Sequence, residues 1–252
     1  MQKEEKGNGI PDQATGMTGK MKNVKPSLLV KFVKYIRDAR LVWDVMGSVY
    51  NRSIHDAITE LYDHIARDVD LRGAARILDA GTGPGYIALL LAADNPQSQI
   101  IGIDYSIMQV REAEKYRAQR KISNCSFQQG NVMDIRFADE TFDAVVSIGS
   151  VKHWPDSLRG LKEIRRVLKT GGCLIISETD QEASDDAVRR FIRRFKVWFI
   201  PGRLLFWGLR NVIFGQSFSE TTLADAVRDA GFHHIECQRI PACPYVIVKA
   251  QK

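Results

Sequence analysis

The chain has 252 residues, of which 44% are hydrophobic and 26% charged, as in an ordinary globular domain that can bury a sizeable core. Four cysteines without metal-site spacing suit a reducing compartment, and no apolar run reaches the roughly 18 residues that a membrane span needs. The net charge of +6 is local: outside the segment Val188–Phe214, which holds seven cations and no acid, 29 basic residues face 30 acidic ones. General binding to polyanions therefore does not follow from the charge.

The N-terminal part of the chain has few features of a separate domain. Residues 1–25 are polar and lack the apolar stretch of a signal peptide, which predicts a disordered tail on a cytoplasmic protein. Residues 26–72 predict a helical cap, and its second helix, over 53–69, carries apolar side chains at helical spacing. Because so small a unit cannot fold alone, we expect it to cover one larger domain formed by residues 73–252.

From Arg76 onward, strands and helices alternate. This alternation predicts a Rossmann-like, doubly wound α/β sheet with helices on both faces. The expected strands are Arg76–Ala80, Gln99–Asp104, Cys125–Gln129, Ala144–Ile148 and Cys173–Ser177, and the expected helices are Tyr86–Ala93, Ile107–Arg120 and Ser157–Leu168.

The C-terminal strands, about His233–Arg239 and Tyr245–Ala250, have no helix between them, so they can pair only as a hairpin. We therefore expect seven strands, mostly parallel, with an antiparallel C-terminal edge. Two helix boundaries also follow from the sequence. Gly171-Gly172 is a stop signal for the helix before it, and Ser219 is expected to cap the last helix, with Thr222 where a capping box has Glu.

A glycine-rich turn lies at the centre of this pattern. The first expected strand ends at Asp79, and three glycines follow at alternate positions: Gly81, Gly83 and Gly85. Glycine allows a sharp turn with positive φ, and its missing side chain lets a ligand approach the backbone closely. The second strand ends in Asp104, an acid that can accept both hydroxyl protons of a ribose.

The glycine spacing separates two kinds of nucleotide site. A dinucleotide turn, G-x-G-x-x-G, would place its third glycine at position 86, where this chain has Tyr86. The observed pattern, Asp-x-Gly-x-Gly-x-Gly, resembles motif I of the class I S-adenosylmethionine-dependent methyltransferases. Further stretches resemble that family and its small-molecule branch (methyltransferase domains 11 and 25): Gly130–Val132, Phe142–Ser147, Val151–Trp154 and Glu163–Gly172.

The resemblance implies S-adenosylmethionine as the cofactor and a role for each matching residue. Gly81, Thr82, Gly83 and Gly85 would form the methionine loop, and Asp79 would help to hold the donor's amino group. Asp104 would hold the ribose, with Tyr105 packing beside the adenine. Asn131 stands where the family usually has an acid, yet its amide oxygen can accept from the adenine amino group, and the backbone of Val132 can bond a ring nitrogen. Backbone groups around Ser147 and Ile148 would close the site near the sulfonium.

Catalytic residues are less well defined by the sequence. A general base is needed only if the acceptor is a protonated group such as a phenol or carbon acid, and His153 follows the fourth strand at a suitable place. The alternative is a histidine packed at the start of the next helix. Tyr50 in the cap is a candidate for lining the pocket, and core packing of this tyrosine is the alternative. No residue set predicts a metal site.

A basic and aromatic insert, at about residues 184–216, precedes the last helix. Aromatic side chains flanked by cations suit an anionic membrane surface or an anionic partner. The alternative is a pair of covering helices with solvated arginines; nucleic acid is less favoured, since the motifs of nucleobase methylation are missing.

We therefore expect a methyltransferase that acts by in-line displacement on a small, lipophilic or amphipathic acceptor. The protein itself is expected to be cytoplasmic and to bind peripherally at a membrane. Two alternatives stay open: an NAD(P)-dependent oxidoreductase, and a non-catalytic protein that binds S-adenosylmethionine.

Overall fold

The computed structural model describes residues 58–69, 75–194, 201–240 and 243–252. The expected N-terminal tail, the first cap helix and Tyr50 lie outside these residues. Residues 58–68 form the described part of the second cap helix, and Ile58, Leu61 and Ile65 are buried as their helical spacing predicts.

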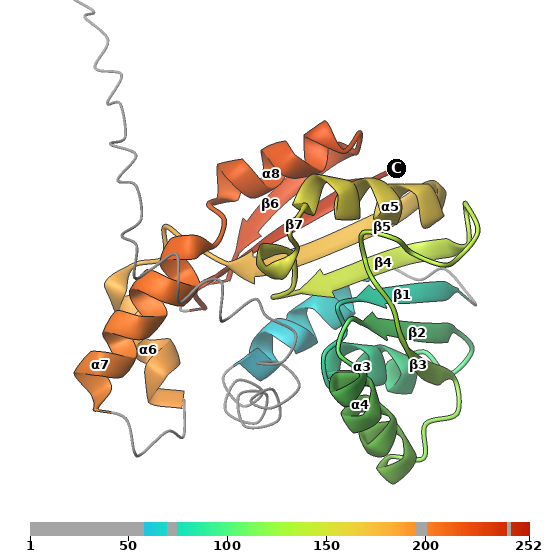
Figure 1. Cartoon of the computed structure of the whole chain (residues 1–252), viewed down its shortest axis with the longest axis horizontal. Helices are drawn as coiled ribbons and strands as arrows, with labels where there is room; N and C mark the ends of the chain where they lie inside the picture. The colour runs from blue at the N-terminus through green and yellow to red at the C-terminus, as the bar shows by residue number, and fades with distance from the viewer. Residues whose placement is uncertain (1–57, 70–74, 195–200, 241–242) are drawn as a thin grey trace, which may run out of the picture.

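The described chain builds a seven-stranded sheet with the order β3-β2-β1-β4-β5-β7-β6 (Figure 1). All neighbouring strands are parallel except the pairs β5–β7 and β6–β7. The predicted sheet with an antiparallel C-terminal edge is thus confirmed. The strands are β1 (Arg76–Ala80), β2 (Gln99–Asp104), β3 (Cys125–Gln129), β4 (Phe142–Ile148), β5 (Leu168–Thr179), β6 (His233–Arg239) and β7 (Tyr245–Gln251).

Helices cover both faces of the sheet (Figure 1). One buried cluster packs helix 58–68, α3 (Tyr86–Asp94) and α4 (Ile107–Gln119) against the sheet. The opposite cluster packs α5 (Ser157–Val167) and α8 (Glu220–Asp229). Both faces of the central strands are therefore covered, and β1 and β4 are buried along most of their length.

The end of α5 differs from the prediction. The helix stops at Val167, and Leu168 already pairs with Phe142 in the sheet. Gly171 and Gly172 lie inside β5, at an irregularity in its pairing with β4, where Gly171 has φ +76°. The two glycines therefore allow a bulge in a strand and do not stop the helix, because burial of Leu168 in the sheet ends it earlier.

The start of α8 also corrects the sequence interpretation. The Ser219 side chain accepts from the Thr222 N–H, and the Thr222 hydroxyl accepts from the Ser219 N–H. The threonine therefore completes a capping box although it is shorter than Glu. Gly231, with φ +94°, follows the end of the helix, where a left-handed residue is common.

The basic insert forms α6 (Asp185–Arg194), α7 (Gly202–Gly208) and two further helical turns, η2 (Leu209–Ile213) and η3 (Phe214–Gln216). Figure 1 shows α6 and α7 projecting beyond the sheet. Two insert cations have acidic partners from outside Val188–Phe214: Arg194 contacts Glu60 at 3.1 Å and Arg210 contacts Asp185 at 3.2 Å. These ion pairs partly relieve the mutual repulsion of the cations in the insert. Within the described residues, no helix is both long and apolar enough to traverse a bilayer.

Candidate active site

The glycine turn between β1 and α3 is held by its own backbone. The N–H groups of Gly81 and Thr82 both donate to the Ile103 carbonyl at 2.9 Å, which ties the turn to β2. Gly81, Gly83 and Gly85 all have positive φ, between 53° and 79°. The left-handed backbone explains why the sequence requires glycine at these alternate positions.

Asp104, at the end of β2, fixes the other side of this turn. Its carboxylate accepts from the Gly83 N–H at 2.9 Å and from the Ser106 N–H at 2.8 Å. Ser106 in turn caps α4 by accepting from the Gln109 N–H. Asp104 therefore orders the turn and also lines the cavity, where a carboxylate is a suitable acceptor for ribose hydroxyls.

Asp79 lies behind the turn and not on the cavity surface. It is buried, and the Thr82 hydroxyl donates to its carboxylate at 2.5 Å. Burial is the largest cause that raises the pKa of Asp79, to about 7; the Thr82 hydrogen bond opposes the rise and the negative charge of Asp104 adds to it. Thr82 lines the cavity and its hydroxyl contacts the Asp79 carboxylate. Asp79 can therefore interact with the amino group of a bound donor only by way of the Thr82 hydroxyl or past the edge of this side chain.

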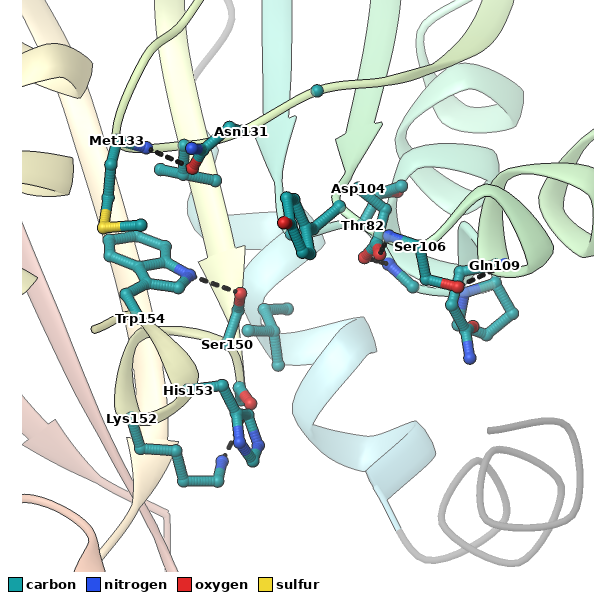
Figure 2. Close-up of a pocket in the computed structure, with 18 of the residues that line it drawn as sticks. Thr82, Asp104, Ser106, Gln109, Asn131, Met133, Ser150, Lys152, His153 and Trp154 are labelled. Atoms are coloured by element: carbon teal, nitrogen blue, oxygen red, sulfur yellow. Dashed lines mark hydrogen bonds between the residues drawn. The ribbon is translucent and has the colours of Figure 1, made fainter. Parts of the chain in front are cut away.

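Ser150, just after β4, packs directly on the turn. A Cβ placed on Gly81 would overlap the Ser150 side chain. The Ser150 Oγ accepts from the Trp154 indole N–H at 2.9 Å (Figure 2). The missing side chain of Gly81 thus lets the β4 loop approach the glycine turn, a relationship that the sequence did not indicate.

These elements enclose a cavity of about 320 Å³, within the size range of small-molecule sites. Two predicted site residues besides Asp79 do not reach it: Gly85 packs against Phe127, and Ser147 is buried and donates to the Ala80 carbonyl. The predicted residues that line the cavity are Gly81, Thr82, Gly83, Asp104, Tyr105, Asn131, Val132, Ile148 and His153.

One end of the cavity has the properties of an adenine site. The Asn131 Oδ1 accepts from the Met133 N–H at 3.0 Å, and Met133 and Tyr105 provide apolar surface. A carbonyl oxygen has a second lone pair, so the expected acceptance from an adenine amino group remains available to Asn131.

The other end combines apolar walls with two basic side chains. Figure 2 shows Lys152, His153, Ser150 and Trp154 across the cavity from Asp104 and Thr82. Ile148 contributes from β4, and the remaining apolar lining comes from elements far apart in the chain: Ile58 and Tyr62 of helix 58–68 and Tyr245 of β7.

Several lining residues were not identified from the sequence. Pro84 and Gln109 lie beside the glycine turn, and their positions follow from the turn once its geometry is known. Lys152 and Trp154 lie in the Val151–Trp154 stretch that resembles the family, but the sequence assigned them no role. Met133 and Ser150 were also missed, and Tyr62 and Tyr245 reach the cavity only through helix packing and sheet pairing.

The residues fit S-adenosylmethionine. A Cβ on Gly83 would meet only the Gln109 side chain, at 3.8 Å, so the backbone there is open to a ligand in the cavity. The Asp104 carboxylate suits a ribose, the Asp79–Thr82 pair lies near the turn for an ammonium, and Tyr105 and Met133 can flank a flat base. Within the described residues, no group of three metal-ligating side chains occurs.

Comparison with known proteins identifies the family. Residues 71–198 match a family described as a methyltransferase domain, which is half of the chain. The chain belongs to this family. Together with the sheet and the glycine turn, the match makes it a class I S-adenosylmethionine-dependent methyltransferase, with S-adenosylmethionine as its cofactor.

Its similarity to curated proteins is moderate. A 2-methyl-6-phytyl-1,4-hydroquinone methyltransferase of Oryza sativa subsp. japonica is 29% identical over 156 residues, which cover 60% of this chain and 44% of the rice protein. A ubiquinone/menaquinone biosynthesis C-methyltransferase of Geotalea daltonii is 40% identical over 105 residues, covering 41% and 45% of the two chains. The chain thus spans less than half the length of these relatives.

A solved structure shows the same fold. Phosphoethanolamine N-methyltransferase 2 of Haemonchus contortus, in complex with S-adenosyl-L-methionine, superposes with a TM-score of 0.65 at 14% identity. The superposition covers 84% of this chain and 59% of the other.

Proposed function

We propose that this methyltransferase acts on a small lipophilic acceptor of the hydroquinone type. The observation that carries the proposal is the chamber beside the donor turn, where Ile148, Tyr62 and Tyr245 provide apolar walls and His153 provides a base. The relatives named for hydroquinone and quinone substrates support the same class of acceptor.

The proposed chemistry is an in-line displacement at carbon. When bound, the cofactor supplies an electrophilic methyl group on a sulfonium. The chamber aligns an electron-rich ring carbon with that methyl group and excludes water, so that the carbon–carbon bond forms as the carbon–sulfur bond breaks. His153 then accepts the proton that leaves the methylated ring carbon, and aromaticity is restored.

A direct assay tests this function. The protein is incubated with S-adenosylmethionine and short-chain 1,4-benzohydroquinones and 1,4-naphthohydroquinones under reducing conditions, and products are analysed by mass spectrometry and NMR. We expect one added methyl group on a ring carbon, and much less product with the Asp104→Ala variant at a limiting concentration of S-adenosylmethionine. Failure to methylate any of these hydroquinones, or methylation of amines in their place, would refute the proposal. A chain that binds the cofactor without catalysis would give no product with any acceptor.

We further propose that the insert brings the enzyme to an anionic membrane surface, where lipophilic acceptors reside. On α7, Leu204 is 59% exposed and Trp207 is 48% exposed, beside the exposed Arg203. The Arg189 guanidinium lies over the Phe206 ring at 4.2 Å, which places a cation next to the aromatic surface. Apolar side chains flanked by cations favour binding to anionic lipid.

Flotation with vesicles tests this contact. We expect the wild-type protein to bind vesicles containing phosphatidylglycerol more strongly than neutral phosphatidylcholine vesicles, and the variant Leu204→Glu/Trp207→Glu to lose the binding. Leu158→Glu, at an exposed leucine on α5, is the matched control. Equal binding to both vesicles, or no loss in the double variant, would contradict the contact.

For residues 26–72 we propose a cap that closes over the acceptor, with Tyr50 facing it. Tyr50→Phe is then expected to lower the rate of hydroquinone methylation and to leave the affinity for S-adenosylhomocysteine unchanged. If Tyr50→Phe methylates hydroquinones at the wild-type rate, the proposal is contradicted and core packing of Tyr50 is favoured.

A further inference from the structure

A buried ion pair lies at the acceptor end of the cavity. Lys152 belongs to η1 (Val151–His153), directly after β4, and its side chain is 4% exposed. Its ammonium group is 2.9 Å from the carboxylate of Glu178, which is fully buried near the end of β5. Neither the glycine turn nor the family resemblance assigns a role to this pair.

The ammonium has a second fixed partner, and Lys152 is one of the residues that line the cavity. The Lys152 Nζ donates to the Gly149 carbonyl at 2.8 Å, and the Glu178 carboxylate also accepts from the Lys152 backbone N–H. An ammonium carries three donors, of which the described residues use two. Since Lys152 lines the cavity, a third hydrogen bond to a bound acceptor is geometrically available.

A purely structural role explains this arrangement poorly. Removing two charges from water costs several kcal/mol, and a pair of apolar side chains would join η1 to β5 at least as well. The charged pair has a specific consequence for binding, because it provides an ammonium donor next to apolar walls. In the absence of a ligand, the Glu178 carboxylate neutralises the charge of this ammonium. An anionic oxygen would accept a hydrogen bond from the ammonium and be stabilised, whereas a protonated amine, which can only donate, would find no acceptor at this ammonium.

We propose that Lys152 binds the ionised oxygen of an acidic hydroxyl on the acceptor, a phenolate or an enolate. This rests on the proposed function and narrows its substrate class. The hydroxyl proton leaves to solvent as the acceptor binds, and the negative charge raises the electron density at the neighbouring ring carbons. Glu178 acts as a positioning residue, because it holds the ammonium and does not itself touch the acceptor.

A binding experiment without turnover tests the proposal. The probe is 4-nitrophenol, whose phenol and phenolate forms absorb at different wavelengths, titrated into protein saturated with S-adenosylhomocysteine at a pH below the probe's own pKa. We expect the wild-type protein to bind the phenolate form and so to increase the phenolate band. Lys152→Met should weaken this binding by at least about tenfold, and Lys152→Arg should retain most of it.

Two further variants keep the result interpretable. Lys152→Met leaves Glu178 unpaired, so Lys152→Met/Glu178→Gln removes both charges and protects the fold; it should also lose the phenolate band while its affinity for S-adenosylhomocysteine is unchanged. Lys162→Met, at an exposed lysine on α5, is the matched control and should behave as wild type.

The outcomes separate this proposal from the function on which it rests. No phenolate band with wild-type protein, or an equal band with the double variant, would overturn the role of Lys152. A Lys152-dependent phenolate band in a protein that methylates no hydroquinone would support the role of Lys152 and refute the proposed acceptor class.

Discussion

The Thr82 hydroxyl donates a hydrogen bond to the buried carboxylate of Asp79 at 2.5 Å, directly beneath the glycine turn. Burial raises the pKa of this carboxyl to about 7 in spite of the hydrogen bond. An acid with a raised pKa in the folded state destabilises that state when it is ionised. The turn therefore holds a charge that is unfavourable until a cation, such as the amino group of the donor, comes near it.

Asp79→Asn should make the donor-free protein more stable at pH 8. Because the pKa of Asp79 is raised in the folded state, the contribution of this group to stability is fully present below its unfolded pKa of about 3.8. That contribution is lost as the pH rises through about 7. Since one pKa unit corresponds to about 1.4 kcal/mol, we expect the variant to gain on the order of 1–4 kcal/mol at pH 8 in urea unfolding, and the gain to shrink as the pH falls toward 4. The same variant should bind S-adenosylhomocysteine more weakly. A variant that is less stable than wild type at pH 8 would contradict this assignment.

Asp104→Ala should weaken the binding of S-adenosylhomocysteine by roughly 10- to 100-fold in isothermal titration calorimetry. The carboxylate orders the turn through the Gly83 and Ser106 N–H groups and offers acceptors to the ribose, and hydrogen bonds to charged groups contribute about 1.5–3 kcal/mol each. Asp156→Ala is a control, because Asp156 caps α5 and accepts from the Arg159 N–H, outside the cavity. It should lower stability and leave the affinity unchanged. Equal losses of affinity in both variants would show that Asp104 acts only through stability.

Gly81→Ala tests the close approach of Ser150 to the turn. Gly171 has nearly the same φ, +76° against +78°, but a Cβ there would meet nothing within 4 Å. Gly171→Ala should therefore cost only the backbone strain, about 1–2 kcal/mol, whereas Gly81→Ala should cost a further 1–3 kcal/mol, roughly, from the overlap with Ser150. Combining Gly81→Ala with Ser150→Gly should recover much of that additional loss. Similar free energies of unfolding for the two single variants would mean that the β4 loop moves away without cost.

The sequence predicted the bounds of three strands and misplaced the start of two others, for a physical reason. β4 begins two residues before the predicted Ala144, and β5 begins five residues before the predicted Cys173. β1, β2 and β3 have the predicted bounds because short apolar runs beside turn residues form strands by local preference and burial. Leu168 fits a helical pattern equally well, and only its pairing with Phe142 places it in β5. Such a choice depends on a partner strand 26 residues away, which a local pattern does not contain.

The same distinction applies to the site. The glycine turn and Asp104 were predictable because each marks the end of its own strand. Lys152 and Glu178, in contrast, meet only because β4 and β5 are neighbours, and Tyr245 reaches the cavity only because β7 lies antiparallel to β5. The donor half of the cavity can thus be predicted from one local motif and the strand ends beside it. The acceptor half depends on which strands are neighbours in the sheet.

Asn131→Asp should tighten the binding of S-adenosylhomocysteine by up to about tenfold. The Asn131 Oδ1 already accepts from the Met133 N–H, so a single lone pair of this oxygen is left for the adenine amino group, and the other polar atom of the amide is an NH₂ group that can only donate. Aspartate keeps the bond to Met133 and supplies a second acceptor oxygen, and one additional hydrogen bond contributes about 1 kcal/mol. Calorimetry on the variant measures this gain, and Asn131→Ala, which removes both interactions, should bind more weakly than wild type. If Asn131→Asp instead weakens binding while Asn131→Ala has no effect, the adenine lies elsewhere in the cavity.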